Sequence, residues 1–289
     1  MISFERTVKH AKILNPLKGF EEDAITFEYR QDPLTGRNTT VIRGMLSYID
    51  KFLVSDEKLL SSLAEKTRMN CPFCPERVKE KTPMFTQDFC EEGRIFVGDA
   101  IVIPNLLGHA ERSALVVISR QHHLMLKDFA AKLIFDAFKG GLAYVRRLSE
   151  VEPSIRFPVF IFNYLPPAGS SIFHPHMQVL ARDRPFYLVN LLLEKSEVYY
   201  QSNKSDYWQN LVCKEKSGKR YLFEKNGVEW LVPFAPLRGL NEAQAIVKGK
   251  SNLLELNDGE WLGLAEGITR ILQFYGERGY TSFNAILLS

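Results

Sequence analysis

Two stretches of this chain show the same order of predicted elements: strand, strand, helix, strand. The first covers residues 94–165 and the second covers residues 229–289. The exits from the two helices also match, because "YVRRLSEVEPSIRFPVFIFN" parallels "ITRILQFYGERGYTSFNAIL". A recurring order of this kind indicates the duplication of one α+β unit. We therefore expect an α+β fold with two related repeats, each with an antiparallel sheet and a long helix.

The two predicted repeats differ in their details. The helix of the first copy, expected over residues 126–153, contains Gly140-Gly141, where a break is expected. The helix of the second copy begins with Asn257 or Asp258 as its cap. A helix-rich connector joins the copies, and the second copy stops at Ser289, so we expect it to be incomplete. A further short helix is predicted over residues 55–70.

Composition narrows the classes of protein that the chain can represent. A net charge of +3 over 289 residues is too small to indicate nucleic-acid binding. No apolar stretch approaches the roughly 20 residues that a membrane-spanning helix needs. The start of the chain mixes charges and does not resemble a secretory signal, and its four cysteines read as intracellular thiols. We expect a cytoplasmic protein without nucleic-acid or membrane partners.

The segment Cys71-Pro72-Phe73-Cys74 is the first that could carry chemistry. Two thiolates at this spacing can bind one zinc ion, but they provide only half of a tetrahedral site. A redox role is the alternative, although a thioredoxin-like C-x-x-C follows a strand and opens a helix, and this one does not. Histidine would supply the missing ligands. His122 and His123 follow a predicted strand, and His109 is a less constrained candidate.

The segment His174-Pro175-His176 places two imidazoles one residue apart. In an extended chain these side chains face the same side, and Gln178 continues that face. The small residues of "PPAGSS" upstream could bring backbone amides close to a phosphate. A neutral imidazole beside such a loop suits nucleophilic attack on phosphorus. A metal-binding pair and two buried core histidines are the alternatives.

Several ordered motifs resemble those of the galactose-1-phosphate uridylyltransferase family of the histidine-triad superfamily. "HPHMQ" at residues 174–178 resembles the family's H-P-H-G-Q signature, with Met177 in place of glycine. The early C-x-x-C, the S-x-x-H at residues 119–122 and the asparagine at position 163 also match. "YRQDPLTGR" near the N-terminus and "EWLVPFAPL" after the connector are similar to further family segments. The resemblance covers nearly the whole chain.

The resemblance implies a role for each matching residue. It implies zinc as the cofactor, bound by Cys71, Cys74, His122 and His174. It implies that His176 attacks the α-phosphorus of a nucleotide sugar and carries the nucleotide covalently, while Gln178 donates to the phosphoryl oxygens. The residues implied to hold the phosphates are Asn163, Gly169, Ser170 and Ser171, with Arg30 and Arg37 as charge partners of the diphosphate.

The predicted enzyme is a nucleotidyltransferase of galactose metabolism that moves a nucleoside monophosphate between a nucleotide sugar and a hexose 1-phosphate. UMP is the nucleotide that the resemblance favours. Its partners are the nucleotide sugar and the sugar phosphate, and the family also implies a homodimer. The alternatives are a phosphorylase of an ADP-sugar or dinucleoside polyphosphate, and a non-catalytic nucleotide-binding zinc protein. Residues 1–185 are expected to hold the first repeat, the zinc knuckle and the active site. Residues 186–289 are expected to hold the connector and the partial second repeat.

Overall fold

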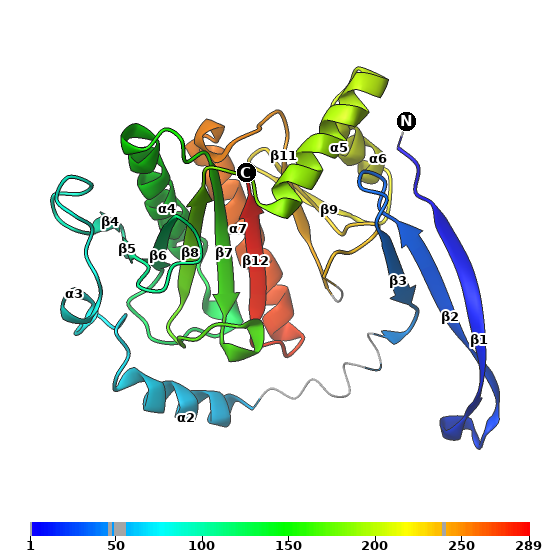
Figure 1. Ribbon diagram of the computed structural model, residues 1–289. Helices are drawn as coiled ribbons and strands as arrows, with labels where there is room; N and C mark the ends of the chain where they lie inside the picture. The colour runs from blue at the N-terminus through cyan, green and yellow to red at the C-terminus, as the bar shows by residue number, and fades with distance from the viewer. Residues whose placement is uncertain (1, 46–47, 49–55, 239–240) are drawn as a thin grey trace. The chain divides into compact units, whose positions relative to one another are not determined.

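The computed structural model describes residues 2–45, 48, 56–238 and 241–289 (Figure 1). Its mixture of helices and antiparallel sheets confirms the predicted α+β class. The chain divides into two compact units, each with segments from distant parts of the sequence. Unit 1 comprises Met1–Leu53, Asn190–Glu224 and Val228–Gly249; unit 2 comprises Val54–Val189, Lys225–Gly227 and Lys250–Ser289.

Unit 2 is built on a six-stranded antiparallel sheet in the order β12-β7-β8-β6-β5-β4. Apolar and β-branched residues dominate these strands, as their burial requires. The strands are β4 (Ile95–Val97), β5 (Ala100–Pro104), β6 (Arg112–Val117), β7 (Phe157–Tyr164), β8 (His176–Arg182) and β12 (Phe283–Leu288). The last strand of the chain therefore pairs with a strand of the first predicted repeat.

Two long helices, α4 (Ala131–Val151) and α7 (Asp258–Glu277), lie side by side against one face of this sheet (Figure 1). Trp261 of α7 is fully buried and stacks on Phe160 of β7, with ring centroids 6.2 Å apart. Asn257, one of the two expected caps, begins α7 in a capping box with Glu260. The aromatic contacts between helices and strands form the core of unit 2.

The expected break in the first long helix is wrong, because α4 continues through Gly140 and Gly141. These glycines instead allow the helix to approach the sheet closely. A Cβ placed on Gly141 would lie 2.9 Å from a ring carbon of Phe160 and 3.2 Å from Val179. Helix–sheet packing thus overrides the weak helix propensity of the glycine pair.

The opposite face of the sheet is covered only in part. The C-x-x-C segment packs over Ile103 and Val117 on β5 and β6. Val189, at the start of α5 (Tyr187–Asn203), packs over Val159 and Leu180 on β7 and β8. On the same face, Ile161 and Gln178 are partly exposed.

Unit 1 contains two three-stranded antiparallel sheets. The first joins β1 (Arg6–Asn15), β2 (Glu21–Gln31) and β3 (Asn38–Ile42), and the second joins β9 (Tyr221–Lys225), β10 (Val228–Leu231) and β11 (Gln244–Val247). The turn between β2 and β3 is stabilised by the Asp32 carboxylate, which accepts hydrogen bonds from the amides of Leu34 and Thr35. The connector contains helix α5 and helix α6 (Tyr207–Lys216), as expected of a helix-rich segment. It also contains strand β9, which was not predicted.

A buried carboxylate stabilises the first sheet of unit 1. Glu28 is 2% exposed and accepts hydrogen bonds from Arg30 at 2.8 Å and from Arg43 at 2.8 Å. These two guanidinium groups lower the pKa of Glu28, against the opposing effect of burial.

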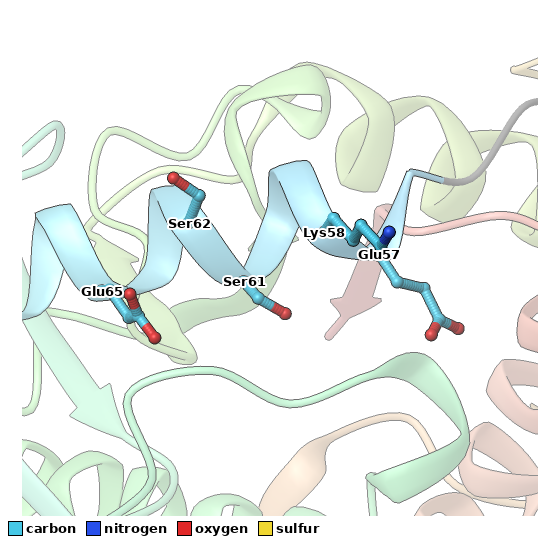
Figure 2. A pocket seen from close by; sticks show the side chains of 5 residues that line it. All are labelled: Glu57, Lys58, Ser61, Ser62 and Glu65. Atoms are coloured by element: carbon cyan, nitrogen blue, oxygen red, sulfur yellow. The ribbon is translucent and has the colours of Figure 1, made fainter.

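The predicted short helix is present as α2 (Glu57–Arg68), capped by the Asp56 carboxylate, which accepts from the amide of Leu59. None of its described side chains is buried. Figure 2 shows five of its polar side chains, which line a shallow hollow on the outer surface of the helix. Within the described part of the chain, no helix has the length and apolar character to cross a membrane. The repeat boundary at residue 185 stays a prediction. The two compact units are defined by contacts in space, whereas the predicted boundary separates two duplicated segments of sequence.

Candidate active site

The two cysteines of the C-x-x-C segment lie in a tight turn directly after α2. The amide of Cys71 donates to the carbonyl of Arg68, and the carbonyl of Cys74 accepts from the amides of Arg77 and Val78. Cys71 is 4% exposed and Cys74 is 1% exposed. The turn therefore holds both sulfurs in the interior, against β5 and β6.

Two histidines from distant parts of the chain meet these sulfurs. His122 follows β6, and its Nδ1 lies 3.4 Å from Sγ of Cys74. His174 precedes β8, and its Nδ1 lies 3.7 Å from Sγ of Cys74 and 3.8 Å from Sγ of Cys71. All four side chains are buried, and their ligand atoms lie within 4.8 Å of one another. The group could hold a metal ion.

The outer nitrogen of each imidazole has its own partner. Nε2 of His174 donates to the carbonyl oxygen of Ser119 at 2.7 Å. Nε2 of His122 lies 2.9 Å from the hydroxyl of Thr67, which itself donates to the carbonyl of Leu63 and so accepts from the imidazole. Both rings therefore turn an unprotonated Nδ1 toward the sulfurs, which is the arrangement found in histidine ligands of metals.

The spacing of the donor atoms fits a tetrahedral ion. With bonds of about 2.3 Å to sulfur and about 2.0 Å to nitrogen, a tetrahedral zinc ion places sulfur and nitrogen about 3.5 Å apart. Three of the four sulfur–nitrogen pairs lie 3.4, 3.7 and 3.8 Å apart. Burial lowers the pKa of His174 to about 4, so its imidazole is neutral and able to bind a cation. Burial and the neighbouring Cys71 raise the pKa of Cys74 to about 12, and a bound cation would offset both effects.

His176 lies beside this group, and its contacts differ from those of His174. Its Nδ1 donates to the carbonyl oxygen of His174 at 2.8 Å. Its ring meets the edge of Phe73, with centroids 5.2 Å apart, and the residue is 7% exposed. Burial lowers its pKa, which keeps the ring neutral. The protonated Nδ1 leaves a lone pair on Nε2.

Strand register places the predicted polar residues on the partly open face of the sheet. Ile161 of β7 pairs with Gln178 of β8, so Asn163 and His176, each two residues away, point to the same side. Gln178 and Asn163 are partly exposed. The structure thus brings the predicted nucleophile, glutamine and asparagine together.

Met177, which stands where the family signature has glycine, does not share the face of β8 on which His176 lies. It is 1% exposed and pairs with Val116. Because side chains alternate along a strand, Met177 points to the face that α4 and α7 cover. The replacement of glycine therefore changes the core and not the open face.

The loop between β7 and β8 carries the predicted small residues. The amides of Gly169 and Ser170 donate to the carbonyls of Pro166 and Leu165, and the hydroxyl of Ser170 donates to the carbonyl of Ile172. These groups shape the loop, whereas Ser171 is exposed. Leu165 opens the loop with φ of 66° and ψ of 161°, a conformation that normally requires glycine.

Arg30 and Arg37 belong to unit 1, and their guanidinium groups are engaged there. Arg30 binds Glu28 and the carbonyl of Phe234. Arg37 donates to the carbonyl of Ala235 at 2.7 Å. Their role as partners of a diphosphate stays a prediction.

Sequence reasoning missed three residues that contact the site. Thr67 and Ser119 hold the outer nitrogens of the two histidines, and Asn284 of β12 donates to the side chain of Asn163 at 2.7 Å. Ser119 lies in the S-x-x-H segment, so its position was marked although its contact was not. Thr67 and Asn284 carry no local signal, because each reaches the site through tertiary packing.

Comparison with known proteins gives relatives over most of the chain. No family model matches. An uncharacterised protein of Archaeoglobus fulgidus is 32% identical over 286 residues, which cover 98% of this chain and 81% of that protein. A crystal structure of an ADP-glucose phosphorylase from Arabidopsis thaliana with bound ADP-glucose is 20% identical. Its TM-score is 0.66, over 90% of this chain and 81% of that one. A uridylyltransferase mutant is 25% identical with a TM-score of 0.56, over 83% of this chain and 72% of that one.

Proposed function

We propose that the chain is a nucleotidyltransferase of the galactose-1-phosphate uridylyltransferase-like family that acts through His176, since its motifs resemble that family and its fold is similar to those of an ADP-glucose phosphorylase and a uridylyltransferase. It would move a nucleoside monophosphate from a nucleotide sugar to a hexose 1-phosphate. UMP is the nucleotide that we propose. The nucleotide would be carried between the two on the imidazole.

The hydrogen bond from Nδ1 of His176 to the carbonyl of His174 carries this proposal. A backbone carbonyl only accepts, so the proton must reside on Nδ1 and the lone pair on Nε2. The ring is neutral because burial lowers its pKa. A neutral, fixed imidazole with its lone pair on one nitrogen is an activated nucleophile.

The reaction is proposed as two displacements at phosphorus. In the first, Nε2 of His176 forms a bond to the α-phosphorus as the bond to the bridging oxygen breaks, and the sugar 1-phosphate leaves with the electron pair. In the second, a phosphate oxygen of the acceptor bonds to the same phosphorus and the imidazole leaves. Two steps through one intermediate give ping-pong kinetics.

Three side chains near His176 would bind the phosphates. Gln178 shares its face of β8 and would donate to the non-bridging oxygens that gain charge during transfer. Asn163, on the neighbouring strand, and the exposed Ser171 would hold the diphosphate. Gly169 and Ser170 would shape the loop that presents Ser171. Arg30 and Arg37 are assigned to the diphosphate by family resemblance alone.

The buried Cys71, Cys74, His122 and His174 would hold zinc, for which two thiolates and two imidazoles are a common tetrahedral set. A zinc ion held this way supplies structure, since its four ligands leave no position for substrate. His174 links the two parts of the site. Its imidazole faces the cysteines while its carbonyl fixes His176.

A second candidate is the phosphorolysis of an ADP-sugar, with inorganic phosphate as the acceptor. It uses the same covalent step, and the Arabidopsis phosphorylase shares the fold over most of this chain. A phosphate acceptor requires no pocket for a second sugar.

Incubation with UDP-glucose or ADP-glucose, followed by mass spectrometry of the intact protein, tests the proposal. We expect a mass increase equal to one nucleoside monophosphate, on the peptide that contains His176. The mass of the adduct identifies the nucleotide base. The compound that releases the nucleotide from the protein, galactose 1-phosphate or inorganic phosphate, identifies the acceptor. The absence of an adduct with either nucleotide sugar would contradict covalent catalysis.

A further inference from the structure

Asn284 lies in β12, at the edge of the unit 2 sheet, and contacts two parts of the candidate site. Its Nδ2 lies 2.7 Å from Oδ1 of Asn163 and 2.6 Å from the carbonyl oxygen of Ala168. In the antiparallel register, Asn284 pairs directly with Asn163. The residue is exposed, so it is not part of the hydrophobic core.

The partners of Asn284 fix the orientation of two amides. The carbonyl of Ala168 can only accept, so Asn284 must present its NH2 group there. The second hydrogen of the same NH2 then points to Asn163, which must present its Oδ1. The amide of Asn163 therefore keeps both of its own N–H groups for another acceptor.

We propose that Asn284 is a positioning residue that sets Asn163 as a hydrogen-bond donor toward an anionic oxygen of the nucleotide sugar. This role rests on the proposed function. It adds Asn284 to the site and gives the site a preference for phosphate oxygens. A donor pair at Asn163 selects the phosphate oxygens, which only accept. With the opposite amide orientation, the carbonyl oxygen would face the phosphate and repel it.

Asn284 also connects β12 to the loop that leads to Ser171. Ala168 ends the short helical turn η3 (Pro166–Ala168), which directly precedes Gly169-Ser170-Ser171. One amide thus holds both the side chain of Asn163 and the start of the proposed phosphate loop. Both acceptors of the Asn284 amide belong to the proposed substrate site. A contact that served only the stability of the fold would not need them to lie there.

A double-mutant cycle tests the proposal, with binding of UDP-glucose and ADP-glucose measured by titration calorimetry. Asn163→Ala and Asn284→Ala should each weaken binding by about tenfold, since each removes one charge-assisted hydrogen bond or its support. The double variant should bind no worse than Asn163→Ala alone. Asn284→Asp should weaken binding more than Asn284→Ala, because its carboxylate accepts from Asn163 and turns the amide.

The control is Asn190→Ala, which removes an exposed asparagine amide that donates to Glu194 in α5. It should leave binding unchanged. Melting temperature and metal content should be the same in all variants, which separates positioning from folding. Independent, additive losses at positions 163 and 284, or unchanged binding in Asn284→Ala, would overturn the proposal.

Failure of the proposed function gives a different result. Nucleotide sugars would then bind and show the coupling between Asn163 and Asn284 while no adduct forms on His176. If neither nucleotide sugar binds the wild-type protein, both the function and the role of Asn284 are wrong.

Discussion

Nδ1 of His176 lies 2.8 Å from the main-chain oxygen of His174, two residues earlier in the chain. The same His174 turns its own Nδ1 to Cys71 and Cys74. One residue therefore joins a group that could hold a metal to the ring that could attack phosphorus. The two histidines of the H-P-H segment have different partners and different tautomers.

Removal of the His176 imidazole should abolish the covalent adduct. For His176→Ala, we expect turnover to fall by at least about 10³-fold, as for other nucleophile deletions. Binding of the nucleotide sugar and the metal content should persist. Adduct mass and steady-state rates measure the effect. Turnover that survives in this variant would show that another residue is the nucleophile.

Metal content should depend on the C-x-x-C segment. Purified wild-type protein should contain about one zinc ion per chain, and Cys71→Ser should contain far less, because a hydroxyl is a poor zinc ligand. The melting temperature should fall in parallel. Elemental analysis by mass spectrometry measures the ion. Cys213→Ser, at an exposed cysteine, is the matched control and should keep the metal.

The hydroxyl of Thr67 should strengthen metal binding through His122. Thr67→Val removes the acceptor for Nε2–H of His122 with little change in side-chain volume. Loss of such an outer partner lowers metal affinity by roughly 10–100-fold, measured by competition with a chelator. Thr67→Ser retains the hydroxyl and should bind the metal like the wild type. Equal affinities in Thr67→Val and Thr67→Ser would show that the contact has no effect.

Stability should depend on pH through Glu28. The folded protein lowers the pKa of this carboxyl below its usual 4.5, chiefly through hydrogen bonds from Arg30 and Arg43. A carboxyl whose pKa is lower in the folded protein stabilises the fold at pH values above its pKa in the unfolded chain. That contribution is lost as the pH falls through its pKa in the folded protein. Glu28→Gln should therefore cost about 2 kcal/mol near neutral pH.

The difference between wild type and Glu28→Gln should shrink as the pH falls below about 4.5 toward the lowered pKa of the folded state. Chemical denaturation at a series of pH values measures the difference in the free energy of unfolding. Other acid-sensitive groups are common to both proteins and cancel in the comparison. A constant difference across this range would contradict the assignment.

Gly141→Ala should destabilise unit 2 although alanine favours helices. The new methyl group would meet the ring of Phe160, which is buried against Trp261 and cannot move away. Overpacking costs about 1–3 kcal/mol, whereas the gain in helix propensity is about 1 kcal/mol. Arg146→Ala, at an exposed position of the same helix, should change the free energy of unfolding little. Greater stability in Gly141→Ala would show that the helix can shift.

Local patterns predicted most elements of unit 2, because its helices and strands have clear periodicity and caps. Asn257, one of the two caps expected for the second long helix, is the residue that caps α7. The family resemblance also implied the four residues that the fold brings together. The pairing of β12 with β7, the unbroken α4 and the contacts of Thr67 and Asn284 could not be predicted. Each depends on which surfaces meet in three dimensions.

The group of Cys71, Cys74, His122 and His174 also has a consequence for the order of folding. The chain between Cys74 and His122 spans 48 residues, and that between Cys74 and His174 spans 100 residues. An ion bound by all four would close both loops at once, as a pair of covalent cross-links would. The pairing of β6 with β8 brings His122, which follows β6, and His174, which precedes β8, to the same end of the sheet. Full metal coordination would therefore be a late event in folding, and its rate would report when the central sheet is assembled.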